Sequence, residues 1–320
     1  MKSKKDLLKI EENRSLYRKG NFMTDSLELI ASSAAFDGEI RFYKHHSTAL
    51  NAEAKFSVFL PRRALKDMAA RKKGIDCKGR TPYIMALAGL TSHHKTFITK
   101  SGALPFVNQH NIALVCPDTS PRNCNLDKVE DCWWIGEGAG YYLNATKEPW
   151  SKHYKMYDYI SEELPKLVAS QLWLDNDRKS IMGHSMGGMG ALNFGLKEPE
   201  KWLSVSAFAP ATNPSKCQWG IDAAKLYFND PAEGKAYDPT HLLQDGRRHN
   251  TPILIDQGKE DKFLHDGQLL PKNFLNVADK VSQSVIFRAH EKFDHSYWFI
   301  QSFIQSHIEF HSLYLHNDKH

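Results

Sequence analysis

Short apolar runs of strand length alternate along this chain with longer stretches in which apolar residues recur at helical spacing. Most of the runs are bounded by Gly, Pro, Asp or Asn, as buried strands are. Nearly unbroken apolar strands are typical of a parallel sheet that helices cover on both faces. The pattern therefore predicts an α/β fold with a mostly parallel central sheet. The expected strands are Phe56–Leu60, Tyr83–Ala88, Ile112–Cys116, Ser180–Gly183, Val205–Ala209, Ile253–Asp256 and Val285–Arg288.

Two of the intervening stretches show clear helical spacing. Apolar residues share one helix face between Tyr157 and Val168, where Pro165 should bend the helix, and Ile300–His311 marks a terminal helix. No internal repeat and no Gly/Ser-rich or Pro-rich linker divides the chain. We therefore expect a single domain over residues 26–320, preceded by an N-terminal extension over residues 1–25.

Composition places the chain among globular proteins. Of its 320 residues, 41% are hydrophobic and 25% are charged, which excludes the disordered and collagen-like classes. No run approaches the ~18 uninterrupted apolar residues of a membrane span, and residues 1–18 lack the apolar segment of a secretory signal. We expect a cytoplasmic protein that does not associate with membranes.

The five cysteines argue against a disulfide framework and against a structural zinc site. They form neither a Cys-x-x-Cys pair nor an even set. We expect reduced thiols, no metal site and no organic cofactor.

The positive charge of the chain is concentrated in one segment. Residues 62–80 carry eight Lys and Arg against two Asp, a net charge of +6, whereas the whole chain carries +5. Such a segment could attract an acidic partner, but a basic run is more often a solvated surface loop. We interpret it as a basic insertion in the domain and expect no binding of nucleic acid.

The strongest motif is Gly-His-Ser-Met-Gly at residues 183–187, which follows an expected strand and opens an expected helix. The turn from strand to helix in such a motif is so sharp that bulky residues beside the serine would clash, which explains the glycines. Ser185 is then exposed at the carboxyl end of the strand. The helix N-terminus favours negative charge there, and the backbone N–H of Met186 points to a forming oxyanion. The motif predicts a nucleophilic serine; the alternative is a tight turn in which Ser185 only caps the helix.

A serine nucleophile needs a histidine as base and a carboxylate that orients the histidine. When the nucleophile lies in such a strand–turn–helix motif, the acid is expected in the loop after a later strand, and the histidine in the loop after the strand that follows. Asp261 competes with Asp256 and Glu260 after the first of these strands, although Asp256 stands too early to reach across. His295 competes with His290 after the second, and its position directly before the last helix favours His295.

Several longer stretches, in the same order along the chain, resemble the S-formylglutathione hydrolase (esterase D) family. The resemblance runs from about Leu29 to Leu315. The stretches that carry it are Gly183–Gly188 with Gly190–Leu192, Ser204–Pro210, Pro117–Arg122, Ile255–Lys259 with Asp261–Leu264, and Asp294–Tyr297.

The resemblance implies an α/β-hydrolase fold and a cytoplasmic serine esterase that cleaves S-formylglutathione to glutathione and formate. It implies a triad of Ser185, Asp261 and His295, with Leu90 in Ala88–Thr91 as the second oxyanion donor beside Met186. It also suggests a homodimer. No metal or cofactor enters this reaction, and the partner is a small thioester or ester.

Some positions depart from the family pattern near the expected substrate pockets. Ser92 stands where the family usually has cysteine, so a thiol-sensitive site is not expected there. Cys132–Trp134 replaces Ser-Trp-Asp, and Gln218–Gly220 replaces Pro-Trp-Gly. The resemblance still implies that Trp219 contacts the substrate.

These departures keep two other functions open. A broad carboxylesterase for short-chain acyl esters would use the same triad, with weaker recognition of glutathione. A non-catalytic binding protein on a hydrolase scaffold would use the basic segment as its interaction surface. The complete set of serine, acid and histidine argues against the second alternative.

Overall fold

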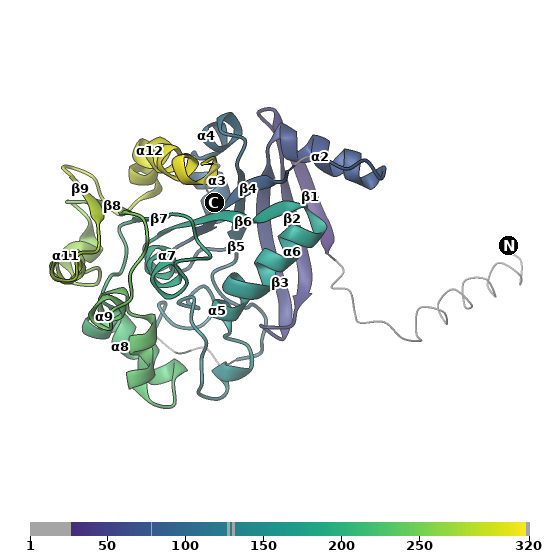
Figure 1. Ribbon diagram of the computed structural model, residues 1–320. Helices are drawn as coiled ribbons and strands as arrows, with labels where there is room; N and C mark the ends of the chain where they lie inside the picture. Colours follow the sequence, from purple (N-terminus) through teal and green to yellow (C-terminus); the bar gives the residue numbers. More distant parts are fainter. Residues whose placement is uncertain (1–26, 78, 127–128, 130–131, 318–320) are drawn as a thin grey trace, which may run out of the picture.

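A computed structural model describes residues 27–77, 79–126, 129 and 132–317. The described residues form a nine-stranded sheet with the order β1-β2-β3-β5-β4-β6-β7-β8-β9. Figure 1 shows this order, with β1 to β3 at one side of the molecule and β8 and β9 at the other. The strands are β1 (Glu28–Ala35), β2 (Gly38–Ser47), β3 (Ala52–Leu60), β4 (Thr81–Leu87), β5 (Ala113–Pro117), β6 (Leu174–His184), β7 (Val205–Phe208), β8 (Ile253–Gly258) and β9 (Val285–His290).

Strand direction divides the sheet into two parts. β1, β2 and β3 pair antiparallel, and β3 also pairs antiparallel with β5. From β5 to β9 all neighbouring strands are parallel. The prediction of an α/β fold with a mostly parallel sheet is therefore confirmed. Parallel strands end at a common edge, so the segments that follow β4, β6, β8 and β9 meet there.

Helices follow most of the parallel strands, as their crossover connections require. The α-helices are α2 (Arg62–Lys72), α3 (Thr96–Lys100), α4 (Leu104–Gln109), α5 (Met156–Asp158), α6 (Leu164–Gln171), α7 (Met186–Lys197), α8 (Gln218–Tyr227), α9 (Pro239–Gln244), α10 (Lys262–His265), α11 (Pro271–Lys280) and α12 (Tyr297–Leu315). A π-helical turn, Tyr159–Glu163, joins α5 to α6. It ends one residue before the Leu164–Pro165 start of α6, and the missing N–H of Pro165 cannot take part in the regular α-helical ladder. The bend expected at Pro165 stays a prediction.

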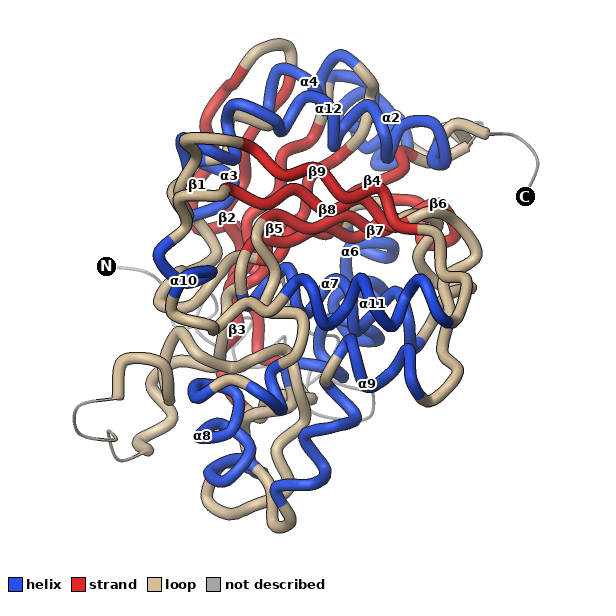
Figure 2. The backbone as a smooth tube through the Cα atoms, turned by 90° about the vertical axis from the view of Figure 1, so that its left-hand side faces the viewer, coloured by secondary structure: helices blue, strands red, loops and turns tan. Residues whose placement is uncertain are grey.

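The helices form a layer on each face of the sheet. Alternate residues of β4 point to the two faces: Ile84 belongs to the buried cluster that contains residues of α3, α4 and α12, whereas Met85 belongs to the cluster that contains residues of α6, α7 and α11. Figure 2 shows α4 and α12 on one side of the strands and α7 and α11 on the other. The central strands are thereby buried on both faces, which explains their unbroken apolar sequences.

The structure corrects the interpretation of the basic segment as a surface loop. Residues 62–72 form α2, an amphipathic helix with Ala64 and Met68 buried against β2 and β3. These two residues are four apart and lie on one face, a spacing that the many charges around them obscured. The exposed cations occupy the outer face of the helix.

The expected extension at residues 1–25 lies outside the described residues. β1 and β2 were not expected, because β1 is exposed along almost its whole length and so has no apolar pattern. In the described part of the chain, no helix combines the length and the apolar character that crossing a membrane requires.

Candidate active site

Ser185 forms the turn between β6 and α7. Its backbone has φ 59° and ψ −119°, a region that L-residues rarely occupy, and its N–H donates a 2.9 Å hydrogen bond to Phe208 O in β7. A methyl group on Gly183 would lie 2.0 Å from Gly187 O, and one on Gly187 would lie 2.1 Å from Leu87 O. Both glycines are therefore required for the tight packing of this turn. The geometry is that of a nucleophile elbow.

The Ser185 side chain lies at the N-terminus of α7. Ser185 is 7% exposed, and among the residues that the structure describes its hydroxyl has no hydrogen-bond partner. Met186 is the first residue of α7, and first-turn N–H groups have no acceptor inside their helix. This helix end can stabilise negative charge that forms beside Ser185.

A four-residue turn, Gly89–Ser92, packs against Ser185 after the end of β4. The Ser92 N–H donates to Gly89 O at 3.3 Å, and a methyl group on Gly89 would lie 3.1 Å from Ser185 Cβ. Thr91 has a φ of 64° and donates its N–H to Gly138 O at 2.9 Å. The turn places Leu90 next to the elbow. Its role as an oxyanion donor stays a prediction.

The Asp261 carboxylate is fully buried at the N-terminus of α10. Its Oδ1 accepts hydrogen bonds from the N–H groups of Phe263 (2.8 Å) and Leu264 (3.3 Å). Its Oδ2 accepts from Gln257 Nε2 at 3.1 Å and from His295 Nδ1 at 2.6 Å. Four donors thus fix one carboxylate in a single orientation, directed to His295.

His295 lies in the loop between β9 and α12, with 14% of its side chain exposed. Its ring centroid lies 4.5 Å from that of His184, the residue before Ser185, and 4.7 Å from that of Phe263. Backbone hydrogen bonds from Lys259 and Glu260 to the β9 loop join the loops of the acid and the histidine. Burial lowers the pKa of His184 well below its usual range, and the neighbouring His295 adds to this shift.

The rival residues have other partners. Asp256 lies inside β8 and pairs with Arg288 at 2.5 and 2.7 Å, and its Oδ2 is 3.3 Å from His307 Nε2. Burial alone would raise the pKa of Asp256, but His307 and the Arg288 guanidinium lower it to about 2. His290 stacks on Phe303 at 3.7 Å. Neither Asp256 nor His290 is directed to the elbow.

Trp219 belongs to an aromatic cluster that extends to His295. Its ring centroid is 4.9 Å from Trp133 and 5.0 Å from Phe263, which contacts the His295 ring edge to face. Trp133 is 48% exposed. The cluster forms an apolar wall beside the histidine, so an acyl group or a leaving group that reaches His295 also meets aromatic surface.

A cavity of about 910 Å³ opens beside the Gly89–Ser92 turn. Thr91 of the turn and Trp133 of the aromatic wall both line it. The cavity therefore borders both structures. Its volume is in the range of pockets that enclose drug-sized molecules. Glu137 and the thiol-bearing Cys124 and Cys132 also line it.

Three features of the site were not expected from the sequence. Phe263 was known only as part of a motif, Tyr142 donates its hydroxyl to Ala88 O at 2.8 Å just before the turn, and Gly138 lies against Thr91. The glycine-rich run at residues 136–140 was the one available signal for a close backbone approach. Within the described residues, no group of three or more His, Cys, Asp or Glu is arranged to bind a metal ion.

A nucleophile elbow after a parallel strand, with an Asp–His pair in the loops after the last two strands, defines a serine hydrolase of the α/β-hydrolase class. The model of the family described as "Putative esterase" matches residues 47–310. The chain belongs to the S-formylglutathione hydrolase family of esterases.

Relatives from distant organisms match the chain over almost their whole length. The S-formylglutathione hydrolases of Mus musculus and Arabidopsis thaliana are each 43% identical to it, over 91% of this chain and 99% and 98% of their own. The solved structure of an S-formylglutathione hydrolase from Agrobacterium tumefaciens superimposes with a TM-score of 0.83 at 38% identity, covering 90% of this chain and 99% of that one.

Proposed function

We propose that the protein hydrolyses the thioester S-formylglutathione to glutathione and formate, a step in formaldehyde detoxification. The observation that carries the proposal is the 2.6 Å hydrogen bond between Asp261 and His295 beside the Ser185 elbow. The names of the relatives supply the substrate. A histidine that is held in one orientation beside a serine hydroxyl favours catalysis over a binding function without catalysis.

In the first step His295 accepts the Ser185 proton while the serine oxygen attacks the formyl carbon. The carbonyl oxygen becomes an oxyanion, to which the N–H groups of Leu90 and Met186 donate hydrogen bonds. The C–S bond then breaks, glutathione leaves as a thiolate and the formyl group stays on Ser185. His295 gives the proton that it took from Ser185 to the departing thiolate or to solvent, so its imidazole is neutral again before the second step. A thiolate is a good leaving group, so proton donation matters less here than in peptide hydrolysis.

In the second step His295 accepts a proton from water, and the resulting hydroxide attacks the formyl-enzyme. The oxyanion forms again between the same two N–H groups, and formate leaves as Ser185 regains its proton. Asp261 keeps the proton of the neutral imidazole on Nδ1, so that Nε2 is free to act as the base in both steps.

The cavity of about 910 Å³ beside the turn is the site that we assign to the glutathione part of the substrate. It lies next to Thr91, and Leu90 of the same turn faces the reacting carbonyl in this mechanism. We assign Trp219 to the substrate through the aromatic wall that it forms with Phe263.

The experiment that tests the proposal compares kcat/KM of the purified protein on S-formylglutathione and on a short-chain aryl acetate. Both substrates use the same triad, so the ratio reports recognition of the thioester and its glutathione part. We expect S-formylglutathione to be preferred by at least about tenfold, which corresponds to ~1.4 kcal/mol in the transition state. An equal or reversed preference contradicts the proposal.

One observation favours a broad carboxylesterase as the second candidate. The wall of Trp133, Trp219 and Phe263 is apolar and reaches His295, and apolar surface of this kind also accepts short-chain acyl esters. A reversed preference in the same experiment is the result that this candidate predicts.

The cellular setting and the assembly are also part of the proposal. All five cysteines are free thiols in the structure, which suits the reducing cytoplasm. The homodimer expected from the resemblance is tested by sedimentation of the purified protein, in which a monomer mass contradicts it.

A further inference from the structure

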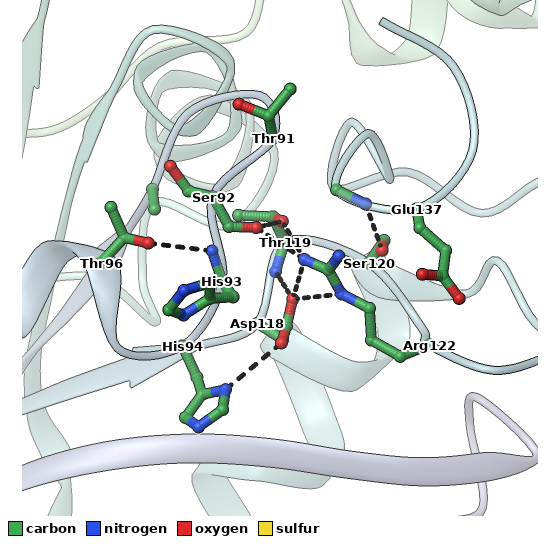
Figure 3. Close-up of polar contacts among 12 residues, drawn as sticks. Thr91, Ser92, His93, His94, Thr96, Asp118, Thr119, Ser120, Arg122 and Glu137 are labelled. Carbon is green, nitrogen blue, oxygen red and sulfur yellow. Dashed lines mark hydrogen bonds and ion pairs between the residues drawn. The ribbon is translucent and has the colours of Figure 1, made fainter. Parts of the chain in front are cut away.

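A second polar cluster lies behind the Gly89–Ser92 turn and touches none of the reacting groups. The Ser92 carbonyl oxygen accepts two hydrogen bonds, from Thr119 Oγ1 at 2.5 Å and from Arg122 Nη2 at 2.6 Å. Figure 3 shows both donors converging on Ser92 from the segment that follows β5. Ser92 also closes the turn through its N–H, so its two peptide groups link the turn to this cluster.

Asp118 holds the guanidinium of Arg122 in place. Its Oδ1 accepts from Arg122 Nη2 at 2.7 Å, from Arg122 Nε at 3.0 Å and from the Thr119 N–H at 2.7 Å. Its Oδ2 lies 3.3 Å from His94 Nδ1. Asp118 is 7% exposed. Burial by itself would raise the pKa of this carboxyl, but His94 and the Arg122 charge hold it below its usual range.

The turn is thus fixed at three points. Tyr142 donates to the carbonyl of Ala88 before it, the Gly138 carbonyl accepts from the N–H of Thr91 within it, and Arg122 together with Thr119 donates to the carbonyl of Ser92 at its end. Only the last of these involves a charged group, and charge-assisted hydrogen bonds are roughly twice as strong as neutral ones. The left-handed conformation of Thr91 is strained for a β-branched residue and persists only where the surroundings enforce it.

We infer that Arg122 is a positioning residue, which aims the Leu90 N–H at the oxyanion by holding the Ser92 carbonyl. The inference rests on the proposed function of the turn as an oxyanion site. A guanidinium is required because one planar group reaches both the Asp118 carboxylate and the Ser92 carbonyl; a lysine ammonium is a single point charge without this fork. These contacts are made by the Ser92 backbone and not by its side chain. Serine in place of the family's usual cysteine therefore leaves the contact between Arg122 and the turn unchanged.

The test uses Arg122→Lys and Arg122→Ala, with Arg178→Lys as the matched control. Arg178 pairs with Asp175 at 2.9 Å and donates to Arg80 O at 2.7 Å, so it has the same kinds of partner. It lies in β6 on the side of the sheet where the parallel strands begin, away from Ser185. Each variant is assayed for kcat and KM on an aryl acetate, and for inhibition by a trifluoromethyl ketone, which the serine converts into a bound oxyanion.

For Arg122→Lys we expect kcat to fall at least about tenfold while KM stays within about threefold, because the lost interaction is made only in the transition state. The inhibition constant of the ketone should rise by the same factor as kcat/KM falls. Added guanidinium should restore part of the activity of Arg122→Ala. Arg178→Lys should match the wild-type protein in all three measurements.

Two results overturn the inference. One is a folded Arg122→Lys protein, with the melting temperature of the control, whose kcat and ketone inhibition equal those of the control. The other is a loss confined to KM, which means that Arg122 binds substrate and does not position the turn. Failure of the proposed substrate is seen separately, as a wild-type protein that hydrolyses aryl acetate but not S-formylglutathione, because the Arg122 measurements use the aryl ester.

Discussion

The Nδ1–H of His295 donates a 2.6 Å hydrogen bond to Asp261 Oδ2, although 34 positions separate the two residues in the chain. The other oxygen of Asp261 is occupied by two backbone N–H groups of α10. The carboxylate can therefore neither turn away nor exchange its partner. This pairing is the geometric basis on which we propose Asp261 as the acid of the site and His295 as its base.

Replacing Asp261 with Asn should lower kcat by about 10³- to 10⁴-fold, because an amide can donate to Nδ1 and thereby stabilise the wrong imidazole tautomer. Glu260→Gln, next to it and exposed, is the matched control and should keep activity near that of the wild type. Steady-state kinetics on the aryl acetate measures both.

Asp256→Asn separates the two candidate acids. It removes the charge that pairs with the partly exposed Arg288, so it should lower the free energy of unfolding by about 1–3 kcal/mol, yet its folded fraction should remain active. If the folded Asp256→Asn protein loses more activity than Asp261→Asn, Asp261 is not the acid.

Ser185→Ala should fold normally and lose at least ~10³-fold in turnover, because the elbow needs a small residue and the reaction needs the hydroxyl. His295→Ala should show a similar loss. The double variant should be little worse than either single one, since the two residues act as a unit. Losses that multiply in the double variant contradict a shared mechanism.

The free energy of unfolding should fall as the pH is lowered from 7 to 5. Burial holds the pKa of His311 and of His184 well below the usual range in the folded protein, with nearby histidines adding to the shift, whereas in the unfolded chain both take up protons near pH ~6.5. Below that pH the unfolded state binds more protons, so each group lowers stability by up to ~1.4 kcal/mol per pH unit.

Denaturant unfolding at several pH values measures this slope. His311 is buried and contacts the Ser204 and Ser206 hydroxyls at 2.7 and 2.8 Å, and His311→Gln should remove one group's share of the slope. His46→Gln, at an exposed position in β2, should leave the slope unchanged. Equal slopes in the two variants contradict the account.

The charges of α2 should not recruit substrate. The C-terminal end of β3 lies beside the start of β5, so α2, which follows β3, lies at the sheet edge opposite to the end of β6 and Ser185. Deleting the segment would also remove the buried Ala64 and Met68, so the test replaces the exposed Lys66, Lys72 and Lys73 with Gln. We expect kcat/KM on S-formylglutathione to depend on ionic strength identically in the two proteins. A salt-sensitive advantage confined to the wild type shows steering by α2.

Sequence patterns predicted those parts of the fold in which burial is complete. β4, β5, β7 and β8 are buried along their whole length, so their apolar sequences made their positions clear. β1 is exposed on both faces and α2 buries only a narrow stripe that includes Ala64 and Met68. In α2 the charges of the exposed face outweigh the apolar signal, whereas β1 is set by its pairing with β2, which the sequence does not reveal.

The same contrast applies to the site. Ser185 lies in a local motif whose glycines are required sterically, and loop position selected His295 as the candidate base. The contact of Phe263 with His295 and the bond from Arg122 to Ser92 join segments far apart in the chain. No local pattern encodes such contacts. The Pro117–Arg122 stretch was visible as a motif, but its role depends on the turn that it supports.

The most direct test of the central claim is to mix the wild-type protein with S-formylglutathione, quench the reaction within the first turnover and map the peptides by mass spectrometry. We expect the added mass of one formyl group on Ser185, formed before formate is released and absent from Ser185→Ala and His295→Ala. A formyl group on another residue, or release of formate by the wild type at the same rate as by Ser185→Ala, contradicts the account.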